Sequence, residues 1–128
     1  MDPTPSRILI VEDDETTADQ YARMLRLEGH EVRTAFSAAS GLEEVESSAP
    51  DAIIVDLHMP TIDGLEFVRR VRSSADSRTT PLAIVTGDYF LDDTILDELR
   101  ALGVEVCFKP LWVEDLAILV QRMLNPAG

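Results

Sequence analysis

Acidic residues, a threonine and a lysine follow short apolar runs at four separate places in this 128-residue sequence. Glu12 and Asp13 follow "RILIV", Asp56 follows "AIIV", Thr86 follows "LAIV" and Lys109 follows "VEVCF". Clustered carboxylates repel one another unless a cation lies between them, and a set of oxygen ligands suits a hard divalent ion such as Mg²⁺. A carboxylate beside such an ion and a lysine can attack phosphorus and form an acyl phosphate. The residue types therefore indicate metal-assisted phosphoryl transfer.

Asp56 is the residue that we expect to act as the nucleophile. A stiff, β-branched apolar run leads directly into it, and Pro60 prevents regular structure from continuing. Glu12 and Asp13 are expected to begin a helix, so they are better placed as ligands of Mg²⁺, or of Mn²⁺ in its place. The metal and Lys109 would together stabilise the oxygens of a phosphoryl group in an in-line transfer.

Short apolar runs alternate with longer amphipathic segments, without an internal repeat or a linker. Strands are predicted at 7–11, 31–35, 52–55, 82–85 and 104–108. Helices are predicted at 15–30, 37–50, 65–74, 91–103 and 113–124. Five strand–helix units predict an α/β fold, doubly wound, with a parallel sheet covered by five helices on both faces. Because parallel strands all end at the same edge of the sheet, the four groups of residues should meet in one shallow basin.

Each of these residues also has a purely structural explanation. The acids at 12–15 would interact favourably with a helix N-terminus, and Asp56 could be a turn residue. Thr86 could cap a helix, and Lys109 could balance nearby acids. Four independent coincidences at one sheet edge are harder to accept than one site, so the joint pattern favours a functional site.

Composition predicts a single domain over residues 1–128 with an acidic surface. The formal net charge is −13, from 24 acidic residues against 11 Lys and Arg, which disfavours binding to nucleic acid. No apolar run approaches the length needed to cross a bilayer, and the polar start "MDPTPSR" lacks the pattern of a signal peptide. A single cysteine, Cys107, excludes an internal disulfide and fits a cytoplasmic protein.

Four motifs, in this order, resemble the receiver domain of two-component response regulators: "ILIVEDDE", "IIVDLHMPTIDGLEFVRRVR", "IVTG" and "FKP". The resemblance covers residues 6–125. It implies a flavodoxin-like (CheY-like) sheet with strand order 2-1-3-4-5. It also implies that Asp56 accepts phosphate from a histidine kinase or a histidine phosphotransfer protein, with no enzymatic activity beyond this self-catalysed transfer and a slow autodephosphorylation.

The resemblance also implies roles for individual residues. Glu12 and Asp13 would be the acidic pair, and the backbone carbonyl of His58 a further metal ligand beside Asp56. Thr86 would hydrogen-bond to the phosphoryl group and Lys109 would form an ion pair with it. A cis peptide bond between Lys109 and Pro110 is implied as well.

One position departs from the family pattern. The family usually carries Tyr or Phe three residues before its lysine, as a rotamer switch coupled to the threonine, and this sequence has Val106 there. We therefore expect Tyr89 or Phe90 to carry the switch, read by a downstream protein on the surface formed by residues 91–124. Trp112 either anchors that interface or packs the final helix. The oligomeric expectation is a monomer or a weak, phosphorylation-dependent dimer.

Two other functions compete with this interpretation. A Mg²⁺-dependent phosphohydrolase with an aspartyl-phosphate intermediate would usually need a second acid near Asp56, where position 58 is His, and a cap over its substrate. A degenerate receiver that only binds partners conflicts with the intact Asp13, Asp56, Thr86 and Lys109. The sequence after Leu124 offers nothing that could bind DNA or catalyse, so signalling is expected to pass through protein contacts. The sequence is compatible both with a natural single-domain protein and with a piece of a longer chain.

Overall fold

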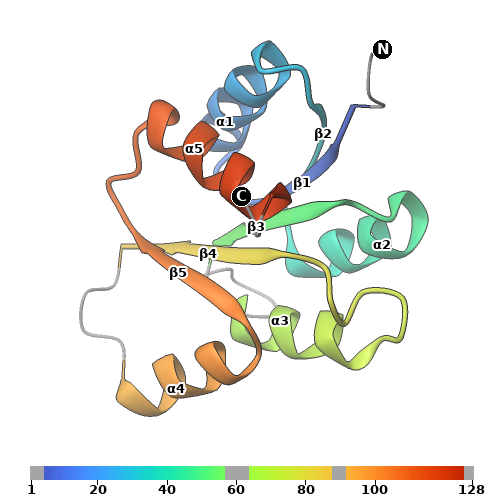
Figure 1. The fold of residues 1–128 in the computed structure, drawn as a ribbon, viewed down its shortest axis with the longest axis vertical. Helices are drawn as coiled ribbons and strands as arrows, with labels where there is room; N and C mark the ends of the chain where they lie inside the picture. The colour runs from blue at the N-terminus through green and yellow to red at the C-terminus, as the bar shows by residue number, and fades with distance from the viewer. Residues whose placement is uncertain (1–4, 57–63, 88–91, 126–128) are drawn as a thin grey trace.

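The computed structural model describes residues 5–56, 64–87 and 92–125, in which five strands alternate with five helices (Figure 1). The strands are β1 (Arg7–Val11), β2 (Glu31–Ala35), β3 (Ala52–Asp56), β4 (Leu82–Thr86) and β5 (Val104–Phe108). The helices are α1 (Glu15–Leu27), α2 (Ala38–Ser48), α3 (Gly64–Ser73), α4 (Asp93–Ala101) and α5 (Val113–Leu124). All strand pairs are parallel and the strand order is β2-β1-β3-β4-β5. The predicted α/β class and strand order are confirmed.

Two apolar layers lie on opposite faces of this sheet, because neighbouring residues of a strand point to opposite sides. In β1, Ile8 and Ile10 pack with α1 and α5, whereas Leu9 and Val11 pack with residues of α2, α3 and α4. Figure 1 shows the same division, with α1 and α5 above the sheet and the other three helices below it. The central strands are therefore apolar on both faces, and polar chemistry is confined to their ends.

The first helix, α1, begins at Glu15, the first residue of the predicted range 15–30, with Asp14 as its N-cap. The separate expectation that Glu12 and Asp13 begin this helix was wrong. The Asp14 carboxylate accepts hydrogen bonds from the Thr16 backbone N–H at 3.1 Å and from the Thr17 hydroxyl at 2.8 Å. Because Asp14 satisfies the helix terminus, Glu12 and Asp13 stay in the connection between β1 and α1. Their position there is not explained by helix formation.

Close packing holds the end of β1 in place. A Cβ atom added at Gly41 of α2 would lie 2.9 Å from Val11 Cγ2 and 3.0 Å from Phe67 Cε2. Real Cβ atoms do not come so near, so this helix can approach the strand only with glycine at position 41. Val11 immediately precedes Glu12, and the tight contact therefore fixes the strand end that delivers the acidic residues.

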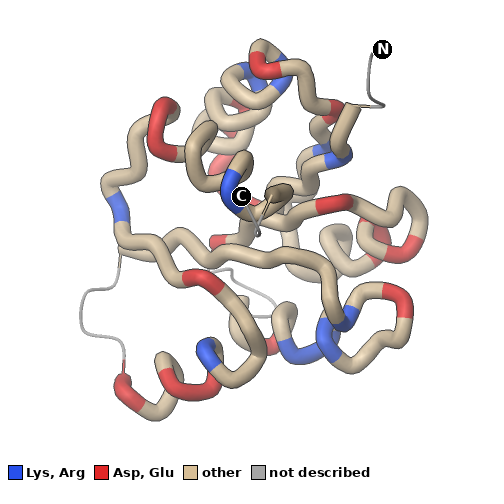
Figure 2. The backbone as a smooth tube through the Cα atoms, viewed as in Figure 1, with Lys and Arg blue, Asp and Glu red and all other residues tan. Residues whose placement is uncertain are grey.

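Acidic residues outnumber basic residues and are interspersed with them along the chain (Figure 2). Both kinds occur on helices and on connections, as expected for a net charge of −13. None of the helices in the described ranges is both long and apolar enough to cross a membrane.

Candidate functional site

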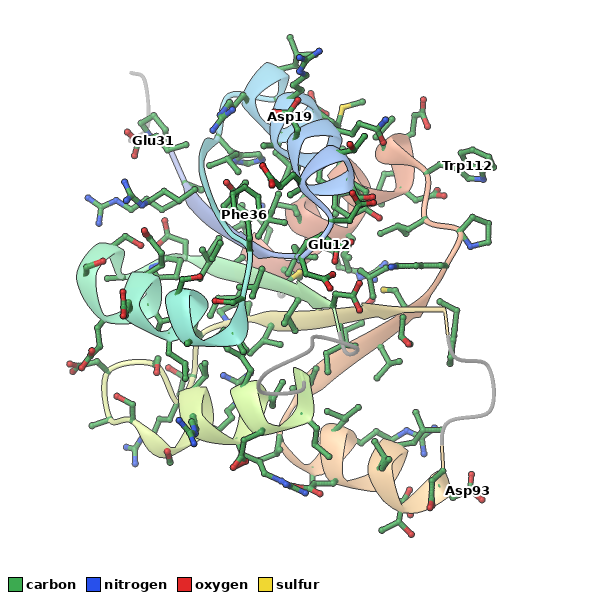
Figure 3. The ribbon with its side chains drawn as sticks, turned by 180° about the vertical axis from the view of Figure 1, so that it is seen from behind. Glu12, Asp19, Glu31, Phe36, Asp93 and Trp112 are labelled. Atoms are coloured by element: carbon green, nitrogen blue, oxygen red, sulfur yellow. The ribbon has the colours of Figure 1, made fainter. Side chains whose placement is uncertain are left out.

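Four strand ends converge at the carboxyl edge of the sheet. Glu12 follows the last residue of β1, Asp56 and Thr86 are the last residues of β3 and β4, and Lys109 follows β5. The structure brings together all of these sequence-predicted residues that it describes. In Figure 3, the labelled Glu12 lies at this edge, next to the strand ends.

Lys109 is the basic residue that joins the acids. Its Nζ atom lies 3.0 Å from Asp56 Oδ2 and 3.8 Å from Glu12 Oε1. The Lys109 side chain is 37% exposed, against 11% for Asp56, so the pair lies at the floor of the basin with its cation toward solvent. The backbone N–H of Lys109 also donates to the Thr86 carbonyl at 2.7 Å, which extends the β4–β5 pairing by one residue and fixes where the lysine starts.

Three carboxylates form a cluster at this edge, and two of them contact the lysine. Single oxygens of Glu12, Asp13 and Asp56 all lie within 4.8 Å of one another. Asp13 is exposed, whereas Glu12 is buried and its Oε2 atom has no hydrogen-bond partner within the described residues. Burial first, and then the hydrogen bond and negative charge of Asp56, raise the pKa of Glu12 to about 8. An unpartnered buried oxygen in an all-carboxylate cluster is what a hard divalent cation would satisfy, so these residues fit Mg²⁺.

The electrostatics of Lys109 complement those of the acids. Its burial alone would lower the pKa of the ammonium group, but the hydrogen bond and charge of Asp56, together with Glu12, outweigh this and raise the pKa. The lysine is therefore held in its cationic form next to the residue expected to become phosphorylated. A cation at this position can bind a phosphoryl oxygen as well as the Asp56 carboxylate.

Two aromatic residues near the site were missed by sequence analysis. Tyr21 of α1 lines a small cavity of about 10 Å³ together with Glu12, Asp56 and Lys109. Phe108 is the strand partner of the fully buried Thr86 and is 40% exposed. Tyr21 has ordinary helical spacing and Phe108 lies in an ordinary apolar strand, so neither carried a signal of its own.

The switch and interface residues differ in their surroundings. Val106 is half-buried and packs against the core layer on the α4 side of the sheet. Trp112 is 66% exposed and precedes α5 without a side-chain cap. His58, Tyr89 and Phe90 lie outside the described residues. The Lys109–Pro110 bond is cis, as the family resemblance implied.

Comparison with known proteins agrees with this geometry. The model of the response regulator receiver domain matches residues 8–121. The chain belongs to the response regulator receiver domain family. Among solved structures, this receiver domain is similar to the chemotaxis response regulator CheY4 of Vibrio cholerae, with a TM-score of 0.85 and 30% identity over 94% of this chain and 100% of the other. A CheY-like receiver domain protein from Methanospirillum hungatei gives a TM-score of 0.87 with 25% identity, covering 96% of each chain.

Curated relatives are longer than this receiver domain. The transcriptional regulatory protein PrrA of Mycobacterium tuberculosis is 32% identical over 125 residues, which is 98% of this chain and 52% of that protein. The response regulator MprA of Mycobacterium ulcerans is 31% identical over 119 residues, which is 93% of this chain and 50% of that protein. The chain thus spans about half the length of the curated relatives that it matches.

Proposed function

We propose that this receiver domain accepts a phosphoryl group on Asp56 from the phosphohistidine of a histidine kinase or a histidine phosphotransfer protein. The observation that carries the proposal is the 3.0 Å contact between Lys109 Nζ and Asp56 Oδ2, at the centre of the carboxylate cluster. A carboxylate held by a cation at the end of a rigid strand is positioned for attack before the donor arrives. Little entropy then needs to be lost in the reaction itself.

The transfer is a displacement at phosphorus. An oxygen of the Asp56 carboxylate forms a bond to phosphorus as the bond from phosphorus to the donor imidazole nitrogen breaks, and the bonding electrons return to that nitrogen. The product is an aspartyl phosphate and a histidine. Lys109, with its pKa raised, keeps its positive charge and binds a phosphoryl oxygen, while the hydroxyl of Thr86 donates to another.

A divalent metal, Mg²⁺ or alternatively Mn²⁺, completes the site in this proposal. Glu12, Asp13 and Asp56 would hold it together with the carbonyl of His58, with Glu12 acting mostly through water. When bound, the ion supplies positive charge that offsets the charge of the phosphoryl oxygens. The clustering of three carboxylate oxygens within 4.8 Å and the unpartnered Glu12 Oε2 support this ligand set.

The phosphorylated state would be read by a protein in the cytoplasm. We assign the output to the surface formed by residues 91–124, with Trp112 as an anchor and with Tyr89 or Phe90 as the moving aromatic in place of Val106. The 66% exposure of Trp112 supports this assignment, because an indole so accessible is available for contact with a partner. A monomer, or a dimer that forms weakly on phosphorylation, fits this surface.

Intact-mass spectrometry tests the proposal. Incubation with acetyl phosphate and Mg²⁺ should add one phosphoryl group, and a chelator should abolish the addition. Asp56→Asn should prevent it, whereas Asp97→Asn, an exposed acid of α4, should leave it unchanged. An adduct of equal yield in Asp56→Asn would remove Asp56 as the acceptor.

A further inference from the structure

A second concave site lies at the opposite end of the sheet, along the open side of the edge strand β2. This basic groove has a volume of about 620 Å³. Its lining comprises three arginines, a histidine, an acid and a few small or apolar residues: Arg7, Ile8, Arg26, His30, Glu31, Val32, Arg33, Ser47, Ser48 and Pro50. Arg7 opens β1 and Glu12 follows it, so one strand length, roughly 15 Å, separates the groove from the phosphorylation site. Figure 3 shows Glu31, at the groove, well away from Glu12.

The charge of the basic groove opposes that of the protein. Three of the 11 Lys and Arg residues of a chain with net charge −13 line it, and Glu31 is the one acid among the described residues of the lining. Arginine is the residue best suited to binding phosphate, since its planar group offers several donors and stays charged. Arg33 pairs with Glu44 and Arg7 Nε lies 3.9 Å from Glu31, whereas Arg26 pairs with no carboxylate of the described residues. The positive charge of Arg26 therefore remains available to an anionic ligand.

The three guanidinium groups are held in place by contacts with the protein. Arg26 Nη2 donates to the Val32 carbonyl at 3.0 Å, and Arg7 Nη1 donates to the Ser48 carbonyl at 3.0 Å. Arg33 forms a two-point ion pair with Glu44 of α2, and Arg7 Nε lies 3.9 Å from Glu31 Oε2, a weaker ion pair that a phosphate would have to compete with. Groups fixed in this way lose little freedom when a ligand binds.

These contacts stabilise the fold but use only some of the N–H donors of each arginine. Each guanidinium has five N–H donors, and the bonds to Val32 and Ser48 use one donor each from Arg26 and Arg7. The bond to Val32 also covers an outward-facing carbonyl of the edge strand, since the preceding residue, Glu31, pairs inward with Ser6. Addition of a peptide strand would have to displace Arg26, so the groove favours a compact ligand over an extended chain.

We propose that the basic groove binds a small organic phosphate of mononucleotide size. The phosphate would be bound by Arg7 and Arg26, and the organic part would fill the remaining volume beside Pro50 and His30. The volume supports this choice because 620 Å³ falls in the range of small-molecule sites and is far larger than a phosphate ion requires. Arginine faces also stack on planar rings, which gives the organic part a surface to contact.

Titration calorimetry and amide NMR with adenosine monophosphate test this proposal. The buffer contains a chelator, so that no metal-dependent binding occurs at the carboxylate cluster. Adenosine monophosphate should bind saturably, and adenosine and inorganic phosphate should each bind more weakly. Amide shifts should be confined to the residues around Arg7, 26–33 and 47–50.

Two variants and a matched control locate the binding. Arg26→Gln and Arg7→Gln should each weaken binding about tenfold or more, the effect of losing one charge-assisted hydrogen bond. Arg23→Gln should leave it unchanged, because Arg23 is on the same helix but pairs with Asp19 outside the groove. Thermal unfolding shows whether each variant is folded. If Arg26→Gln does not fold, the binding measurement on Arg7→Gln tests the proposal.

Three results would overturn the proposal. The first is that binding does not saturate at millimolar adenosine monophosphate. The others are an equal loss of affinity in Arg23→Gln and Arg26→Gln, and amide shifts centred on Asp13 and Lys109. Binding of inorganic phosphate as tight as that of the nucleotide would remove the organic part of the ligand. A glutamate-rich peptide that binds more tightly than the nucleotide would assign the groove to a protein partner instead.

Discussion

Lys109 and Arg72 are half-buried cations at opposite edges of the same sheet, and their surroundings differ. Lys109 Nζ lies 3.0 Å from Asp56 and 3.8 Å from Glu12. Arg72 instead donates to three backbone carbonyls, those of Leu102 and Thr80 at 2.7 Å and that of Ser77 at 3.3 Å. The carbonyls belong to the segments that precede β4 and β5, so this contact lies at the amino edge.

The difference separates a structural contact from a site prepared for a ligand. The carbonyls around Arg72 are neutral, and the guanidinium supplies hydrogen-bond donors to the Leu102 and Thr80 carbonyls and a second donor to the Ser77 carbonyl. At the carboxyl edge, Asp56 and Glu12 share Lys109, Asp13 lies in the same cluster of carboxylates, and Glu12 Oε2 has no hydrogen-bond partner within the described residues. The first arrangement is complete by itself, whereas the second lacks positive charge. We expect mutations to lower stability at the amino edge and to alter ligand response at the carboxyl edge.

The largest effect is expected from removing the Arg72 guanidinium. Arg72→Met keeps much of the apolar stem but removes the guanidinium donor from the Leu102 and Thr80 carbonyls, while the Ser77 carbonyl still accepts from the Thr80 N–H. The variant should lower the free energy of unfolding by about 3 kcal/mol. Urea denaturation measures this change. Arg70→Met is the matched control, since Arg70 is an exposed neighbour on the same helix, and it should change stability by less than about 0.5 kcal/mol. Equal values for the two variants would contradict the structural role of Arg72.

The next largest effect concerns pH and Glu12. Its pKa is raised from 4.5 to about 8 in the folded protein, so between these values the folded state keeps a proton that the unfolded state has released. Without metal, stability should therefore be greatest below this range and fall as pH rises through about 8. Glu12→Gln should flatten this part of the curve, as measured by urea denaturation at several pH values.

Mg²⁺ should counteract the loss of folding stability that rising pH causes in the metal-free protein. Because a metal ligand must be deprotonated, the stabilisation by Mg²⁺ should grow as pH rises toward and beyond 8. Glu43→Gln, an exposed acid of α2, should behave like the unchanged protein in both series. If the metal-free protein instead gains stability between pH 5 and 8 (about the range of the Glu12 shift), burial does not control the Glu12 carboxylate.

Sequence patterns predicted the carboxyl edge well and the amino edge poorly. Asp56, Thr86 and Lys109 could be placed together because each follows an apolar run, and parallel strands end at one edge. Arg72 gave no such signal, because its partners are backbone carbonyls in two connections, and any residue type supplies a carbonyl. The role of Glu12 and Asp13 at the first helix was also misjudged, since "EDDE" contains two aspartates able to cap the helix and only the folded structure selects Asp14.

Asp13 and Asp14 are expected to have different roles, and the effects of replacing them should be smaller than those described for Arg72 and Glu12. Asp13→Ala should reduce the rise in melting temperature that Mg²⁺ causes, with little change in the metal-free protein. Asp14→Ala should lower metal-free stability by about 1 kcal/mol, because it removes the cap of α1, and leave the response to Mg²⁺ intact. Thermal unfolding with and without Mg²⁺ measures both quantities. A weaker Mg²⁺ response in Asp14→Ala than in Asp13→Ala would place the acidic pair one residue later.

The smallest expected effect is the readout of phosphorylation by Trp112. The indole lines a cavity of about 630 Å³ that also contains Gly87, Lys109 and Thr17, so movement of Lys109 or of the strand end at Thr86 changes its surroundings. Because the indole is already 66% exposed, we expect its fluorescence to change modestly rather than by full burial. As the single tryptophan, Trp112 reports without background when acetyl phosphate and Mg²⁺ are added.

Partner binding then tests which residue transmits the signal. At equal phosphorylation, Tyr89→Ala should weaken binding of a downstream protein more than Val106→Ala, since the valine is short and packs against the core. Phe108→Ala is a useful third variant, because Phe108 is paired with Thr86 and half-exposed on the strand itself. A loss confined to Phe108→Ala would place the moving aromatic on β5. Equal binding by all three variants, together with unchanged Trp112 fluorescence, would mean that the signal leaves through another face of the domain.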